Sequence, residues 1–274
     1  MSNDHLRVIR NALKENHDYD ELPEKAVHKL SYLVYKKSEK KGANIALPHF
    51  WYRYGILTQS PDSAPTDTQS PLDSTEQDIV DQTARTVLDQ YYDTSLEDIT
   101  DITYKDAPYE VFGHWRELDK QISDLEDNFN PFFDTTPIRE EVEDKIEAVY
   151  DSFPVSAYPE HEGDLSTWYF ALTRELDMEL EDIQRLHQIN KQFWGIFTLS
   201  VAKEHRYHLT EEDVSQALGI SSFESALQQR RHKLHSLENE ARMDRLDGED
   251  DGLTPATDAV IQPVFDSVGV VHDA

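Results

Sequence analysis

Lysines recur along residues 24–41 at a spacing that would gather them on one face of a helix. At about 100° per residue, four of them fall within about 60° of one another. This lysine stripe comprises Lys25, Lys29, Lys36 and Lys40. From Glu24 to Arg53 there are seven lysines and arginines and two acids, a local charge of +5 in a chain of net charge −29. Such a stripe could dock an acidic partner or a phosphate, or it could be a solvated face paired with acids of the same protein.

A dense aromatic segment, FWYRY, follows the lysine stripe at residues 50–54. Aromatic rings with one polar tip suit both the edge of a core and the centre of a protein interface. Packing beneath the preceding helix is the first interpretation, and an exposed binding patch is the second. Under the second interpretation, the predicted partner-binding residues are Lys29, Tyr32, Lys36, Trp51, Tyr52 and Tyr54.

A second cation-bearing segment spans residues 210–237. Thr210 is placed to cap a short helix that ends at Gly219, and Ser221 or Ser222 is placed to cap the next helix. This layout is typical of a helix-turn-helix, so the alternative function is a DNA-binding transcriptional regulator. Its predicted DNA-binding residues are Arg230, Arg231 and Lys233. Glu224, near the start of the second helix, would repel phosphates, which favours a helical hairpin without a DNA role.

No sequence motif identifies an enzyme. Glycine-rich phosphate loops, the nucleophile elbow and the H-E-x-x-H zinc motif are all absent from the sequence. The carboxylates are so numerous that no pair can be selected as a catalytic acid and base. The histidines near Glu204 and the pair His232 and His235 lack the further ligands of a metal site. We therefore expect no catalytic residue, no metal and no cofactor.

The composition is strongly acidic, with 55 Asp plus Glu against 26 Lys plus Arg and no cysteine. Self-repulsion at this net charge is relieved by concentrated salt, because the Debye length falls to about 3 Å at about 1 M. The sequence therefore indicates a halophilic protein. No apolar run is long enough to span a bilayer and no hydrophobic signal core begins the chain, so we expect a cytoplasmic protein that does not enter membranes.

The hydrophobic periodicity predicts an all-α protein, a multi-helix bundle with a second helical module. Residues 1–153 form the first module and residues 164–246 the second, and the boundary between them is predicted in the proline-containing stretch from Pro154 to Ser166. Residues 58–75 are rich in proline and polar side chains and are interpreted as a flexible loop. Residues 247–274 are interpreted as a disordered acidic tail.

The N-terminal module resembles the Panacea domain of SocA-like antitoxins. The resemblance lies in His28-Lys29-Leu30-Ser31-Tyr32-Leu33, in Tyr54-Gly55-Ile56, in residues 95–99 and in residues 102–109. Ile56, Tyr104 and Tyr109 stand where that pattern has proline, histidine and tryptophan. The resemblance implies an all-helical module that binds a protein partner, either a toxin or a defence or regulatory protein, without catalysis. A structural or assembly protein of a virus or mobile element is a further alternative.

Overall fold

The computed structural model of the chain describes residues 2–16, 22–59, 72–91, 93–128, 136–177 and 183–250. The first helices are α1 (Ser2–Asn16), α2 (Glu24–Lys40), α3 (Ser74–Tyr91), α4 (Leu96–Tyr104), α5 (Val111–Asn128) and α6 (Thr136–Ser152). They are followed by α7 (Glu162–Asp177), α8 (Ile183–Glu204), α9 (Glu211–Leu218) and α10 (Phe223–Asp250). The predicted all-α fold is confirmed.

A small antiparallel sheet, which the sequence reading did not predict, lies within this helical fold. Its strands are β1 (His49–Tyr52), β2 (Gly55–Thr58) and β3 (Arg206–Tyr207), in the order β2-β1-β3. In the β1–β2 hairpin Trp51 pairs with Ile56, and the turn between the strands consists of Arg53 and Tyr54. The dense aromatic segment is therefore a strand and a turn.

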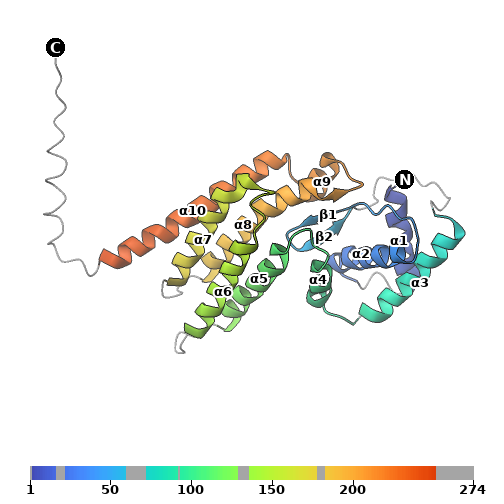
Figure 1. Cartoon of the computed structure of the whole chain (residues 1–274), viewed down its shortest axis with the longest axis horizontal. Helices are drawn as coiled ribbons and strands as arrows, with labels where there is room; N and C mark the ends of the chain where they lie inside the picture. The colour runs from blue at the N-terminus through green and yellow to red at the C-terminus, as the bar shows by residue number, and fades with distance from the viewer. Residues whose placement is uncertain are drawn as a thin grey trace, which may run out of the picture.

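The hairpin lies between two groups of helices (Figure 1). Helices α1, α2 and α3 pack on one another, and α2 also contacts α4 and β2. On the other side, α5, α6, α7, α8 and α10 pack along one another, and α8 also contacts β1. A hairpin held by α2 on one side and α8 on the other connects the two groups.

Helix α2 forms as its apolar spacing predicts. Its buried positions include Ala26, Val27, Leu30 and Val34, which recur at intervals of three and four residues. Pro23 precedes the first helical residue, and Gly42 follows the helix with a φ of +96°. At the start of a helix a backbone N–H has no partner within the helix, so Pro23, which has no N–H, leaves no donor unpaired. Only glycine adopts the φ of Gly42 without steric cost.

The hydrophobic core of the described residues consists of one large cluster and a smaller one beside α9, formed by Phe50, Leu199, Ala202, Val214 and Phe223. One cluster of buried residues runs from Leu6 in α1 to Leu237 in α10, and it includes Tyr158, which is fully buried. Tyr158 belongs to the stretch where we predicted the boundary between modules, and the core shows no interruption there. In the bundle, Trp115 and Trp194 stack with ring centroids 4.4 Å apart.

The two segments predicted to lack structure fall largely outside the described residues. Within the predicted loop, Thr58 belongs to β2 and Leu72 is buried, while residues 60–71 lie outside the described part. Helix α10 extends to Asp250, so residues 247–250 of the predicted tail are helical, and residues 251–274 are not described.

Candidate functional site

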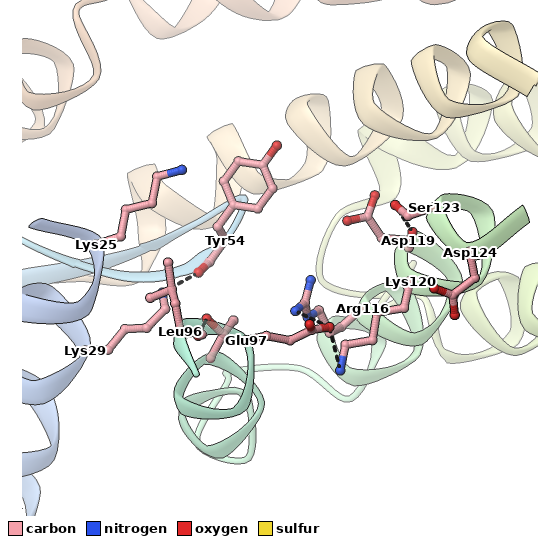
Figure 2. A pocket seen from close by; sticks show the side chains of 11 residues that line it. Lys25, Lys29, Tyr54, Leu96, Glu97, Arg116, Asp119, Lys120, Ser123 and Asp124 are labelled. Atoms are coloured by element: carbon pink, nitrogen blue, oxygen red, sulfur yellow. Dashed lines mark hydrogen bonds and ion pairs between the residues drawn. The ribbon is translucent and has the colours of Figure 1, made fainter. Parts of the chain in front are cut away.

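A groove of about 530 Å³ opens where α2, the hairpin turn, α4 and α5 meet. Lys25 and Lys29 come from α2 and Tyr54 from the turn, and they face the side chains of α5 across the groove (Figure 2). The α5 side chains that line it include Arg116, Asp119, Lys120 and Ser123. Four separate parts of the chain thus converge on one opening.

Lys29 is the most unusual residue of this groove, because its side chain is a buried cation. Only 4% of the residue is exposed, and its Nζ donates a hydrogen bond to the carbonyl oxygen of Tyr54 over 2.7 Å. Burial first, then the nearby charges of Arg116 and Lys25, lower the pKa of Lys29 from 10.5 to about 8. The amine is still mainly protonated at neutral pH, and an ammonium has three N–H donors, so it retains capacity to bind an anion.

The hairpin turn is held from three directions, which fixes the position of Tyr54. The carbonyl oxygen of Arg53 accepts hydrogen bonds from the Tyr104 hydroxyl of α4 at 3.0 Å and from Trp194 Nε1 of α8 at 2.8 Å. Lys29 of α2 holds the next carbonyl. Tyr54 is 45% exposed, and Lys25 Nζ lies 5.5 Å from the centroid of its ring. An exposed aromatic ring on a fixed turn suits contact with a partner.

The cations of α5 differ from those of α2, because they are neutralised within the protein. Arg116 lies 3.1 Å from Asp101 and 3.2 Å from Glu97, and Lys120 lies 2.5 Å and 3.2 Å from the same two carboxylates. By contrast, neither Lys25 nor Lys29 forms an ion pair within the described residues. The unused positive charge of the groove therefore lies at its α2 end.

The α5 end of the groove has the opposite character. Asp119 is buried, and its Oδ1 lies 3.6 Å from Nε2 of His187. Burial raises the pKa of the Asp119 carboxyl above its ordinary value, although the charges of His187 and Lys191 oppose this shift. Asp124 and Ser123 lie beside it (Figure 2). The groove thus offers cations at one end and carboxylate oxygens at the other, which would orient an extended polar ligand.

The structure brings only part of the predicted partner-binding set together. Lys29 and Tyr54 line the groove, whereas Tyr32 and Trp51 are 4% and 2% exposed and pack ring edge to ring face with each other. Tyr52 is partly buried, and its hydroxyl lies 3.4 Å from Arg230 Nη2. Only two lysines of the lysine stripe, Lys25 and Lys29, line the groove. Lys36 does not line it, and its charge contributes to the lowered pKa of His49.

Sequence reasoning missed the α5 and α4 contributions to the groove. Arg116, Asp119 and Lys120 recur at helical spacing, but many polar residues of this chain do so. Only the packing of α4 against α5 shows that Glu97 and Asp101 neutralise two of the cations. Nothing in the local sequence distinguishes a neutralised cation from one that is available.

The predicted helix-turn-helix segment forms two helices, with its turn as expected. Thr210 accepts a hydrogen bond from the Asp213 N–H in a capping box, Gly219 adopts a left-handed φ of +64°, and Ser222 Oγ accepts from the Ser225 N–H. Its arginines, however, are used inside the fold. Arg231 binds both oxygens of the Asp164 carboxylate, at 3.0 and 2.9 Å, whereas Lys233 is exposed.

A buried polar network surrounds Arg231. His161 Nδ1 lies 3.0 Å from Asp164 and its Nε2 lies 2.8 Å from Ser200 Oγ, an order of groups that also occurs in serine hydrolases. His161 is fully buried, Ser200 lies within α8, and Arg231 occupies the Asp164 carboxylate. The network therefore links α7, α8 and α10 at their junction.

Two further features of the described residues bear on the class of protein. None of the described helices combines the length and apolarity needed to cross a membrane. Within the same residues, no group of three or more metal-binding side chains comes together.

Comparisons of the chain with protein-family models, curated proteins and solved structures found no match. The resemblance to the Panacea domain stays a prediction.

Proposed function

We propose that this protein is a non-enzymatic interaction module, antitoxin-like or a regulator of a defence system or mobile element, whose groove binds an acidic segment of a protein partner. One observation carries the proposal. Lys25 and Lys29 present positive charge at an open groove, without an ion pair among the described residues, in a chain of net charge −29. Carboxylates of this chain are abundant, so unpaired cations beside a groove indicate an acid supplied by a partner.

The groove also provides short-range contacts, which concentrated salt would not screen. The exposed ring of Tyr54 supplies apolar area and a hydroxyl at the rim, and buried aromatic anchors commonly dominate interface energies. Charged contacts between exposed groups weaken as the Debye length shrinks. We therefore assign most of the affinity to Tyr54 and partner choice to Lys25 and Lys29.

The DNA-binding alternative receives less support from the geometry. Arg231 is engaged with Asp164, and Arg230 lies within 3.4 Å of Gln192 Oε1 and the Tyr52 hydroxyl. Of the three residues predicted to bind DNA, only Lys233 is exposed. Nucleic-acid affinity depends on several cations reaching phosphates, so one exposed lysine is a weak basis for it.

Selection from a random peptide library on the full chain tests the proposal. We expect enrichment of peptides with Asp or Glu beside an apolar or aromatic residue, at low salt and at about 1 M KCl. Lys25→Glu and Tyr54→Ala should each weaken the selected peptide about tenfold or more. Lys40→Glu makes the same charge change on the same helix outside the groove and should change the Kd less than about twofold.

Two results would contradict the proposal. One is a set of selected peptides without acidic residues, and the other is equal sensitivity to Lys25→Glu and Lys40→Glu. The antitoxin-like role needs a further test, recovery of a protein partner from the source cell. Growth inhibition by that partner should be relieved by the wild-type chain and not by Tyr54→Ala.

A further inference from the structure

A second opening, which shares no residue with the groove, lies between α6 and α7. Its volume is about 410 Å³, and we call it the aromatic notch. It is lined by Glu147, Tyr150, Asp151, Ser166, Tyr169 and Phe170. The proposed function does not use it.

The rings of the aromatic notch are exposed to an unusual degree. Phe170 is 55% exposed and Tyr150 is 40% exposed, which places both among the most exposed large apolar side chains of the described chain. The ring centroids of Tyr150 and Tyr169 are 4.9 Å apart, and those of Tyr169 and Phe170 are 5.8 Å apart. Three adjoining rings, two of which belong to exposed residues, are a site that water solvates poorly.

The charged residues that line the aromatic notch are both acidic. Glu147 and Asp151 are one helical turn apart on α6, and neither has an ion pair among the described residues. The lining contains no lysine or arginine. By contrast, Lys145 of the same helix does form an ion pair, because its Nζ lies 2.6 Å from Glu117 of α5. The notch therefore combines exposed π faces with two available carboxylates.

We propose that the aromatic notch binds an arginine side chain of a protein partner. A guanidinium is planar, stacks on an aromatic face and presents a fork of N–H donors that matches a carboxylate. Stacking on Phe170 or Tyr150 would leave the edge of the guanidinium directed toward Glu147 and Asp151. Charge complementarity favours this occupant. An acidic segment would be repelled by the two carboxylates, and an apolar segment would leave both carboxylates without a partner in the complex.

The probe for this test is a short glycine peptide that carries one arginine, titrated into the full chain and followed by NMR of the aromatic rings. The control peptide carries citrulline, which keeps the shape of the side chain and removes its charge. We expect saturable chemical-shift changes of the Phe170 and Tyr150 rings with the arginine peptide. The citrulline peptide should bind with a Kd at least about tenfold higher.

Matched variants separate the notch from the general field of an acidic protein. Glu147→Gln with Asp151→Asn should weaken the arginine peptide about tenfold, and Phe170→Leu about threefold, because leucine keeps the apolar area and removes the ring. Glu143→Gln with Asp144→Asn removes the same charge from exposed positions of α6 and should change affinity less than about twofold.

Phe170 is mostly exposed, so its substitution should leave the thermal transition unchanged, and this is checked on the same samples. Equal weakening by the two carboxylate pairs, or the absence of saturable binding to the wild-type chain, would overturn the proposal.

Discussion

Helices α2 and α10 both present clusters of cations within a strongly acidic chain, yet the fold uses the two clusters differently. On α10, Arg231 is bound to Asp164 and Arg230 lies against α8, where its guanidinium approaches Gly195. On α2, Lys25 and Lys29 face a groove without an ion pair among the described residues. Cation spacing alone therefore does not identify a binding surface. What decides the role is whether the packed neighbours supply an acid.

The largest expected effect concerns Arg231. Arg231→Met would leave Asp164, whose side chain is 7% exposed, as a buried charge without its guanidinium partner. Breaking a fully buried pair typically costs about 3–5 kcal/mol. Because the Arg231 side chain is 34% exposed and His161 stays 3.0 Å from Asp164, we expect the free energy of unfolding in urea to fall by about 3 kcal/mol. Lys233→Met, two residues away and exposed, should change it by less than about 0.5 kcal/mol. Equal effects of the two substitutions would remove the contrast between α10 and α2.

The second effect is acid sensitivity, which comes from two buried histidines, His28 of α2 and His49 of β1. Burial is the main cause that lowers the pKa of His28 and of His49 from 6.5 to about 4. The unfolded chain then binds more protons between these values, so stability falls as pH drops from 6.5 toward 4. The loss is at most about 3 kcal/mol for each histidine.

A comparison of variants isolates this loss from the titration of the many carboxylates. His28→Gln should show a smaller decrease in unfolding free energy between pH 7 and about pH 5 than the wild-type chain. An identical decrease in both would mean that His28 does not take up a proton on unfolding in this range.

The third effect is a rise in stability at alkaline pH, which comes from Lys29. Its pKa of about 8 in the folded protein lies below 10.5, so the unfolded chain binds more protons between these values and stability rises with pH. Between about pH 7.5 and pH 9.5 we expect a gain of about 1–2 kcal/mol in the wild-type chain, and none from this source in Lys29→Met. Urea titrations at the two pH values measure the difference. The same gain in Lys29→Met would show that the rise has another origin.

The smallest effect concerns Arg230, which is held more loosely than Arg231. A Cβ at Gly195 would lie 2.5 Å from Arg230 Nη1, the end of a flexible side chain. Gly195→Ala should therefore displace the guanidinium at a cost below about 1 kcal/mol. A much larger destabilisation would place Arg230 in the same class as Arg231.

The sequence predicted the helical class, the α2 core face, the Thr210 cap and the Gly219 turn, because each depends on local spacing or on one residue's conformational preference. It did not predict the β1–β2 hairpin, whose signal is short and whose turn is held by Tyr104 and Trp194 from distant helices. Of the six predicted partner-binding residues, Lys29 and Tyr54 line the groove. The burial of Trp51 and the neutralisation of Arg116 depend on tertiary packing, which periodicity does not report.

The pKa of Lys29, measured by NMR of its side chain in the free protein and with the selected acidic peptide bound, tests the central claim most directly. A carboxylate in the groove favours the charged amine, so binding should raise this pKa from about 8 toward its ordinary value of 10.5. Affinity should then be constant below about pH 8 and decrease above it. An unchanged Lys29 pKa in the saturated complex would contradict the assignment of the groove as the acid-binding site.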